Sequence, residues 1–183
     1  MKNGIGLDWG LKTLLTCSNG FRFSNIYNTE RMRKLCVDRD YIKKNFNKSN
    51  PLRTGKLQKV NSEILSLKSN YYNDIIKTIC KWQPPFISIE DIDLKNTIKE
   101  IDETSFNLFV FKLKKVCASR DIELRQVNRY FPSSKTCSRC GYVKHDLKYN
   151  DRIFKCNHCG LEIDRDLNAS INIRDTKNYI RLI

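Results

Sequence analysis

The stretch that decides the fold is Gly4-Ile5-Gly6-Leu7-Asp8-Trp9-Gly10, close to the start of the chain. Successive side chains of an extended strand point to opposite faces. Ile5, Leu7 and Trp9 would therefore share one apolar face, while Asp8 and the first two glycines lie on the other. The pattern predicts a short strand with one apolar face and an acid on the opposite face.

The rest of the chain alternates between strand and helix patterns. Residues 13–18 and 21–24 resemble two further strands, joined at Asn19-Gly20, a strong signal for a hairpin. The later segments are helices over 30–81 with a break near Pro51, a strand over 86–90, a helix over 106–117, a strand over 122–127, a cysteine-rich segment over 130–163 and a helix over 164–179. This order predicts an α/β fold, a mixed sheet flanked by helices.

The chain is strongly basic. Its 183 residues contain 34 Lys+Arg and 20 Asp+Glu, a formal net charge of +14. A protein this basic usually binds a polyanion, most often nucleic acid, although a merely soluble basic protein is the alternative. The excess of positive charge is pronounced over 30–81. Its helical pattern fits a solvated basic face, a face that lies along a phosphate backbone, or both.

The chain has no feature of a membrane or secreted protein. No apolar run approaches the roughly 20 residues of a transmembrane helix, and the first residues do not resemble a signal peptide. We therefore expect a cytoplasmic protein. In that reducing compartment Cys17, Cys36, Cys80 and Cys117 are expected to be small core residues, not disulfide partners.

Two cysteine pairs, Cys137/Cys140 and Cys156/Cys159, are separated by 15 residues. This spacing is typical of a four-cysteine zinc site, in which two tight turns present four thiolates as a tetrahedron. Four protein ligands leave no open coordination position. The sequence therefore predicts a structural zinc ion, not a catalytic one.

The residues around the cysteine pairs support a ribbon. Gly141 and Gly160 directly follow the pairs, where such turns often need a positive φ. His145 and His158 lie in the same segment and could replace a cysteine as a ligand, but the four thiolates already form a complete set. Phe154 is expected to pack the small core of the ribbon.

Basic side chains near the ribbon suit contact with phosphates. Aromatic side chains near the cysteine pairs suit stacking on bases, or they only pack the ribbon. The candidate nucleic-acid contacts among the basic side chains are Lys135, Arg139, Lys144 and Arg165.

Acids occur at the ends of three predicted elements. Asp8 lies in the first strand, Glu90 ends the fourth, and Asp164 and Asp166 open the last helix. Hydrolysis of a phosphodiester with two Mg²⁺ ions needs carboxylates that converge on one spot. Asp8 and Glu90 would share a face if their strands are neighbours, and a helix across the sheet could add a third acid. Each acid also has an ordinary explanation, because Asp164 is a good helix N-cap and Glu90 a common strand-end charge.

Four stretches together resemble the C-terminal half of the TnpB/OrfB family, the transposon-associated nucleases of insertion sequences that are related to type V CRISPR effectors. Residues 4–10 resemble the first RuvC-like motif, and Ile87-Ser-Ile-Glu90-Asp91 with Leu94-Lys95-Asn96 resembles the second. Residues 129–141 (RYFPSSKTCSRCG) resemble the start of the family's zinc ribbon, and residues 164–173 (DRDLNASINI) resemble the third RuvC-like motif. The order and approximate spacing of the four stretches also fit.

The resemblance implies an RNase H-like (RuvC-like) fold with two domains. The nuclease domain would comprise residues 1–129 and 164–183, with a basic helical insert at about 30–81. The zinc ribbon would comprise residues 130–163, inserted before the last helix. The implied partners are DNA and a guide-type RNA.

The resemblance also implies roles for individual residues. Asp8, Glu90 and Asp166 would be catalytic carboxylates that bind Mg²⁺, with Asp164 the less favoured third acid. Asp91 is expected to point to the other face of its strand. Asn168 would support the helix start or contact a phosphate.

One feature departs from the family. Members that cut DNA under RNA guidance carry a large N-terminal region that holds the guide and reads the short motif flanking the target. Asp8 lies almost at the N-terminus here, so we expect that region to be absent. The sequence thus predicts a Mg²⁺-dependent DNA endonuclease core of the TnpB type. The alternative is a non-cutting DNA- or RNA-binding protein, or a truncated transposon product that acts with a longer partner chain. A zinc-ribbon interaction module is disfavoured, because a ribbon alone needs far fewer residues.

Overall fold

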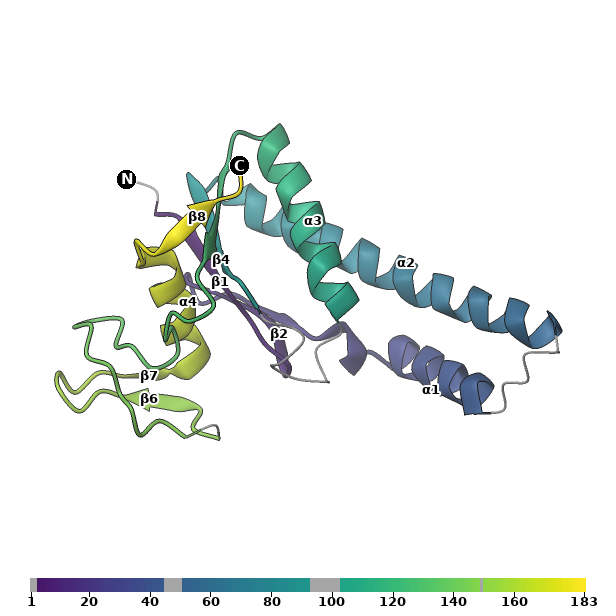
Figure 1. The fold of residues 1–183 in the computed structure, drawn as a ribbon, viewed down its shortest axis with the longest axis horizontal. Coiled ribbons are helices and arrows are strands. Elements are labelled where there is room, and N and C mark those ends of the chain that lie inside the picture. Colours follow the sequence, from purple (N-terminus) through teal and green to yellow (C-terminus); the bar gives the residue numbers. More distant parts are fainter. Residues whose placement is uncertain (1–2, 45–50, 93–102, 149) are drawn as a thin grey trace.

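The architecture is a mixed β-sheet with helices on both faces and a small two-stranded ribbon beside it (Figure 1). The structure is a computed structural model that describes residues 3–44, 51–92, 103–148 and 150–183. The strands are β1 (Ile5–Trp9), β2 (Thr13–Cys17), β3 (Arg22–Ser24), β4 (Phe86–Glu90), β5 (Glu123–Val127), β6 (Ile153–Lys155), β7 (Glu162–Asp164) and β8 (Tyr179–Arg181). The helices are α1 (Glu30–Lys44), α2 (Pro51–Lys81), α3 (Glu103–Ser119) and α4 (Arg165–Asp175), with a short 3₁₀ turn at Ile26–Asn28.

The main sheet has the strand order β3-β2-β1-β4-β5-β8. β4 runs parallel to both β1 and β5, and the other neighbours are antiparallel. Leu7 of β1 lies opposite Ile89 of β4. Because the two strands run in the same direction, Asp8 and Glu90 lie at the same end of the sheet. The predicted mixed sheet flanked by helices is confirmed.

One face of the sheet carries the main apolar core and is covered by α2 and α3 (Figure 1). The ring of Trp9 contacts Phe106 and Phe109 of α3, with centroid distances of 5.3 and 5.1 Å. Leu7 is completely buried on the same side. Burial of each such side chain stabilises the fold by about 1.5–3 kcal/mol. The apolar face predicted for the first strand therefore points towards these helices.

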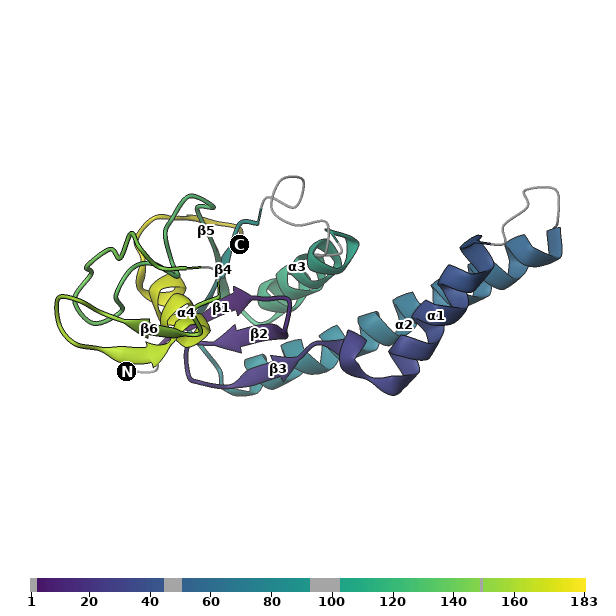
Figure 2. The same cartoon turned by 90° about the horizontal axis from the view of Figure 1, so that it is seen from below.

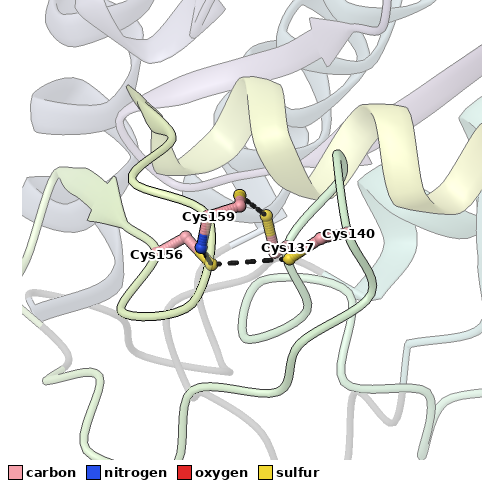
Figure 3. A group of neighbouring side chains, drawn as sticks. All are labelled: Cys137, Cys140, Cys156 and Cys159. Atoms are coloured by element: carbon pink, nitrogen blue, oxygen red, sulfur yellow. Dashed lines mark hydrogen bonds between the residues drawn. The ribbon is translucent and has the colours of Figure 1, made fainter.

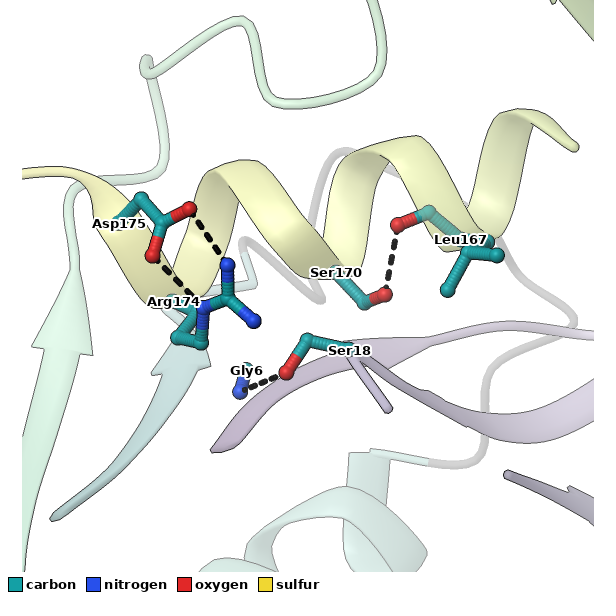
Figure 4. Close-up of polar contacts among 6 residues, drawn as sticks. All are labelled: Gly6, Ser18, Leu167, Ser170, Arg174 and Asp175. Carbon is teal, nitrogen blue, oxygen red and sulfur yellow. Dashed lines mark hydrogen bonds and ion pairs between the residues drawn. The ribbon is translucent and has the colours of Figure 1, made fainter. Parts of the chain in front are cut away.

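α4 crosses the opposite face directly over β1 (Figure 4). The two backbones come closest at Gly6. A Cβ atom there would lie 2.0 Å from the carbonyl oxygen of Ser170 and 2.6 Å from the backbone nitrogen of Arg174. Both are helix backbone atoms, which cannot move aside without moving the helix. Glycine is therefore required at this position because there is no room for a side chain.

α1 and α2 form a long antiparallel pair that extends away from the sheet (Figure 2). They contact through an apolar cluster of Ile26, Met32, Leu35 and Ile64. The break predicted near Pro51 is confirmed, since α2 begins at this proline. Proline is accepted at the first helical position because the N–H that it lacks has no helical partner there. No helix among the described residues is both long enough and apolar enough to cross a membrane.

The end of the chain differs from the prediction. The sequence predicts a helix over 164–179, whereas α4 ends at Asp175 and β8 follows. Thr176 is extended, with φ −62° and ψ 144°. β8 then pairs with β5, where the guanidinium of Arg125 lies 3.5 Å from the Phe86 ring centroid and 4.5 Å from that of Tyr179. This edge strand depends on tertiary contacts, so its local sequence did not reveal it.

Gly6→Ala should lower the free energy of unfolding by about 1–3 kcal/mol, the usual cost of overpacking, because the added methyl group would push α4 away from β1. Gly55→Ala is the control. A Cβ at Gly55 would meet nothing within 4 Å, so this change inside α2 should be neutral or stabilising by up to ~1 kcal/mol. Chemical denaturation measures both effects. Equal stability of the two variants would contradict the close approach at Gly6.

Candidate active site and metal centre

The four paired cysteines come together at the ribbon (Figure 3). All four sulfur atoms lie within 4.8 Å of one another. Cys137 and Cys159 have a sulfur–sulfur distance of 3.6 Å, and so have Cys140 and Cys156. Tetrahedral zinc with Zn–S bonds of ~2.3 Å would place the sulfurs about 3.8 Å apart. The donor set and its spacing therefore fit a structural zinc ion.

The turns of the ribbon have the predicted shape. Gly141 and Gly160 have φ values of 76° and 71°, and each donates its N–H to the carbonyl of the first cysteine of its pair. Phe154 is completely buried against the cysteines, as expected for a ribbon core residue. His158 lies outside the cysteine cluster and stacks on Tyr142, with ring centroids 6.0 Å apart.

Two buried asparagines of α4 hold residues 128–136, the segment that leads into the ribbon and forms its first residues, and the turn between Cys137 and Cys140. Asn168 accepts a hydrogen bond from the N–H of Ser138 at 3.0 Å and donates to the carbonyl of Thr136 at 2.7 Å. Asn172 donates to the carbonyls of Ser133, at 2.8 Å, and Thr136, at 2.6 Å. α4 is therefore bound to the ribbon through amide groups that are withdrawn from solvent.

These contacts correct one prediction. Asn168 is named above as a candidate nucleic-acid contact, yet its side chain is completely buried, with a relative exposure of 0%. Both ends of its amide already bind the ribbon backbone. Asn168 therefore joins the helix start to the ribbon and does not reach a phosphate.

The acids at the ends of β1, β4 and α4 face a common region. Leu7 of β1 pairs with Ile89 of β4, so the next residues, Asp8 and Glu90, lie side by side on these parallel strands. Asp166 lies in the first turn of α4, the helix that packs over β1. Asp8 is close enough to Asp166 and Glu90 for both to raise its pKa. The fold thus brings together three carboxylates that are widely separated in sequence.

Burial is the main cause of the altered acid strength at this site. It raises the pKa of Asp8 well above the usual range, and the carboxylates of Asp166, Glu90 and, least, Asp164 raise it further. The guanidinium of Arg165 opposes this increase. Carboxylates that resist joint ionisation are stabilised by a cation placed among them. A positive charge placed among these acids would therefore lower the pKa of Asp8.

Glu90 has a partner that the sequence did not reveal. Burial raises the pKa of Glu90 to about 7, and a hydrogen bond from Ser133 opposes the increase. The Ser133 hydroxyl donates to Glu90 Oε1 at 3.2 Å. Ser133 belongs to the segment that leads into the ribbon, so this segment contacts the acid site directly.

Asp164 is occupied by contacts of its own. Its Oδ1 atom accepts hydrogen bonds from the N–H groups of Asp166 and Leu167, at 3.1 and 3.0 Å, and so caps α4. The same oxygen pairs with the guanidinium of Arg22 at 2.8 Å. The capping role weighed for Asp164 is thus observed, and it disfavours Asp164 as the third metal ligand.

Asp91 is also bound elsewhere. Its carboxylate pairs with Arg129 at 2.6 Å and accepts a hydrogen bond from Gln126 at 3.1 Å. This ion pair lies beside a pocket of about 190 Å³ lined in part by Asn128 and Tyr130. Asp91 is therefore not grouped with Asp8 as Glu90 is. Leu94-Lys95-Asn96 of the second motif lies outside the described residues.

The acids are less tightly grouped than the thiols. In the part of the chain that the structure describes, the four cysteines are the one group of three or more His, Cys, Asp or Glu residues placed to hold a metal ion. The acids interact electrostatically at longer range. A metal ion between them would require adjustment of their side chains.

The predicted basic contacts lie in different environments. Lys135 and Arg139 are exposed. Lys144 donates to the carbonyl of Lys155 at 3.2 Å. Arg165 donates weakly to backbone carbonyls of the ribbon, at 3.3 and 3.4 Å. Lys135 and Arg139 are thus the most accessible of these side chains.

Sequence reasoning missed Ser133, Arg22 and Asn172 as parts of the site. Each acts through a contact with a residue at least 39 positions away. None belongs to a spacing pattern with a chemical meaning of its own. The only available signal was that Ser133 and Asn172 lie inside stretches that resemble family motifs.

A Cas12f1-like TNB domain matches residues 106–173 of the chain. This stretch runs from α3 through β5 and the ribbon into α4. It contains all four paired cysteines and Asp166.

Two curated proteins are similar over nearly all of the chain. A candidate RNA-guided DNA endonuclease of Streptomyces pristinaespiralis is 29% identical over 178 residues, which cover 92% of this chain and 44% of that protein. TnpB-like protein L79 of Acanthamoeba polyphaga mimivirus is 27% identical over 194 residues, which cover 94% of this chain and 37% of that protein. The chain therefore spans less than half the length of these relatives.

Two solved structures share the fold. One is the Cas12f1–sgRNA–target DNA complex, with a TM-score of 0.68, 23% identity, and coverage of 94% of this chain and 50% of that one. The other is a CRISPR-Cas12f ternary complex, with a TM-score of 0.69, 20% identity, and coverage of 97% and 40%. The mixed sheet and four-cysteine ribbon thus define a RuvC-like fold with a zinc ribbon. The sequence relatives add a similarity to TnpB-like proteins over 94% of the chain.

The raised pKa values predict that the metal-free acid site weakens the fold as pH rises. The folded state holds a proton on Glu90 up to about pH 7, whereas an unfolded glutamate releases it near ~4.3. This stabilising contribution is complete below the unfolded pKa and is lost as pH rises through the folded pKa. The zinc-loaded, Mg²⁺-free protein should therefore lose stability between pH 5 and 8, as followed by chemical denaturation.

Glu90→Gln should remove much of this loss, since the amide carries no proton to release. Glu162→Gln, a change at an exposed ribbon glutamate, should leave it in place. Stability that rises between pH 5 and 8, or an identical profile for both variants, would contradict the assigned burial of Glu90.

Cys137→Ser should abolish stoichiometric zinc binding and lower the melting temperature, because the three remaining thiols cannot complete the tetrahedron. Cys36→Ser provides the control, as Cys36 is half-buried and outside the cluster. Elemental analysis of the purified proteins gives the zinc content per chain. One zinc ion per chain in Cys137→Ser would show that the ligand set is wrong.

Proposed function

We propose that the chain is the catalytic core of a transposon-associated, RNA-guided DNA endonuclease of the TnpB type. The observation that carries the proposal is the convergence of Asp8, Glu90 and Asp166, where burial and mutual repulsion raise the pKa of Asp8. Two central strands and the first turn of one helix carry these carboxylates, so regular elements of the fold hold all three. Hard oxygen ligands of this kind suit Mg²⁺.

Asp8, Glu90 and Asp166 would hold the metal, and each would contribute carboxylate oxygens from a different element. Bound Mg²⁺ would stabilise charge on the scissile phosphate and assist attack by water. Asp164 would keep the N-terminus of α4 capped, so that Asp166 in the first turn is held over β1. Arg165 would limit the mutual repulsion of the acids.

The four cysteines would hold a structural zinc ion that fixes the ribbon. In this proposal residues 1–129 and 164–183 form the nuclease domain, with the helical pair at about 30–81 as a basic insert, and residues 130–163 form the ribbon. Because Asn168 and Asn172 tie α4 to the segment that leads into the ribbon, zinc would also steady the helix that carries Asp166.

The proposed partners are target DNA and a guide-type RNA. Two observations support them. The chain has a net charge of +14, and a solved relative of the same fold was captured with sgRNA and target DNA. Lys135 and Arg139 on the exposed ribbon surface are the proposed phosphate contacts, together with Lys144 and Arg165 at its edge.

A second candidate function is nucleic-acid binding without cleavage, as a partner of a longer chain. The observation in its favour is the net charge of +14, which nucleic-acid binding accounts for without cleavage. The two functions differ in one measurable respect, because only the first requires intact acids for activity.

Asp8→Asn should abolish Mg²⁺-dependent cleavage by the protein co-purified with RNA from its host, while zinc content and RNA binding stay unchanged. Asp91→Asn should retain cleavage to within about tenfold, since Asp91 pairs with Arg129 instead. A parent protein that binds but never cuts would support the second function. Full activity of Asp8→Asn would refute the assigned acid site.

The third carboxylate can be identified with a matched pair of variants. Asp166→Asn should reduce cleavage by at least about 10³-fold, the scale seen when a group acting in the transition state is lost. Asp164→Asn should remain active, because asparagine is an equally good N-cap. The same cleavage assay applies to both. The reverse order of activities would transfer the metal-binding role to Asp164.

A further inference from the structure

The contact between Ser133 and Glu90 joins two parts of the molecule that are 43 residues apart in sequence. Glu90 ends β4 and is half-buried. Ser133 lies between β5 and the first cysteine pair. Its hydroxyl donates to Glu90 Oε1 at 3.2 Å, and the bond does not involve Oε2. One carboxylate oxygen is therefore held by the protein, which leaves the other for a ligand.

Ser133 is itself held in place. Its relative exposure is 6%, and its N–H donates to the carbonyl of Phe131 at 2.8 Å. Its own carbonyl accepts from Asn172 Nδ2, also at 2.8 Å. A side chain on such a constrained backbone can orient a partner with little loss of rotational freedom.

The anchor of Ser133 is α4, the same helix that carries Asp166. Asn172 binds Ser133 and Thr136, and Asn168 binds Thr136 and Ser138. A displacement of the ribbon or of α4 would therefore move Ser133 relative to Glu90. The terminal torsion of a glutamate is soft and has no strong intrinsic preference, so an external donor decides how its oxygens point.

We propose that Ser133 is a positioning residue that orients the Glu90 carboxylate for binding a divalent metal ion. The inference rests on the proposed function, since it assigns a partner to one of its metal ligands. It also gives the ribbon a direct part in building the acid site. Outer-shell partners of this kind typically change metal affinity by about 10- to 100-fold when removed.

The test compares Ser133→Ala with Ser134→Ala, which removes the neighbouring hydroxyl, and with Ser133→Thr, which keeps the donor. Mn²⁺ binding to each zinc-loaded protein is measured by electron paramagnetic resonance, with Asp8→Asn identifying the binding that depends on the acids. The side-chain carboxyl ¹³C resonance of Glu90, assigned with Glu90→Gln, is recorded without Mn²⁺ or Mg²⁺ at one fixed pH.

Ser133→Ala should weaken Mn²⁺ binding by about tenfold or more and shift the Glu90 resonance, with no change in zinc content. Ser134→Ala and Ser133→Thr should resemble the parent in both measurements. If Ser133→Ala loses zinc or cooperative unfolding, Ser133→Thr carries the test, and a changed affinity and resonance in that variant would overturn the proposal.

Unchanged Mn²⁺ affinity and an unchanged resonance in folded Ser133→Ala would also overturn it. The result for the proposed function is separate. If the parent shows no Mn²⁺ binding that depends on Asp8, the nuclease proposal fails, and a resonance shift in Ser133→Ala would still establish that this hydroxyl orients Glu90.

Discussion

The close contact between α4 and β1 at Gly6 is the constraint on which the rest of the site depends. A helix normally packs on a sheet through side chains, which keep the two backbones apart. Here the helix backbone lies within 2.0 Å of the position that a Cβ would occupy, so the helix rests on the strand itself. This contact brings the start of α4, with Asp166, over the strand that carries Asp8. One missing side chain thus sets the separation of two acids that are distant in sequence.

The acid site is a costly feature of the metal-free protein. Burial is the main cause of the raised pKa values of Asp8 and Glu90, and neighbouring carboxylates raise the pKa of Asp8 further. A cation that binds only the folded state would relieve the repulsion between these acids and stabilise the fold. In the ribbon, by contrast, the four thiols already have the spacing that a tetrahedral metal requires. The two centres are coupled through α4, because its asparagines bind the ribbon and its first turn supplies an acid.

Local sequence signals predicted much of this arrangement. The alternation in residues 4–10 predicted the buried face of β1, Pro51 predicted the break between α1 and α2, and the cysteine spacing predicted the ribbon. These features are decided by neighbouring residues or by fixed spacings. The resemblance to the TnpB/OrfB family added the pairing of Asp8 with Glu90 and Asp166, which spacing alone could not distinguish from ordinary surface charges.

The features that sequence could not supply are those made by distant contacts. β8 exists because Tyr179 packs on Arg125 and pairs with β5, and the preceding helical pattern gives no sign of it. Asn168 matched the third motif, but only the structure shows that its amide is used inside the ribbon. Ser133 is a common residue in a loop until its distance from Glu90 is known.

In the proposed function, the contact of α4 with β1 assembles a divalent metal site from three elements. A crystal structure of the zinc-loaded protein soaked in Mn²⁺, with anomalous data collected at the absorption edges of both metals, tests it most directly. We expect a manganese peak bounded by the carboxylates of Asp8, Glu90 and Asp166, and a separate zinc peak among the four cysteines. Manganese bound at Asp164 or Asp91, with none between the three assigned acids, would contradict it.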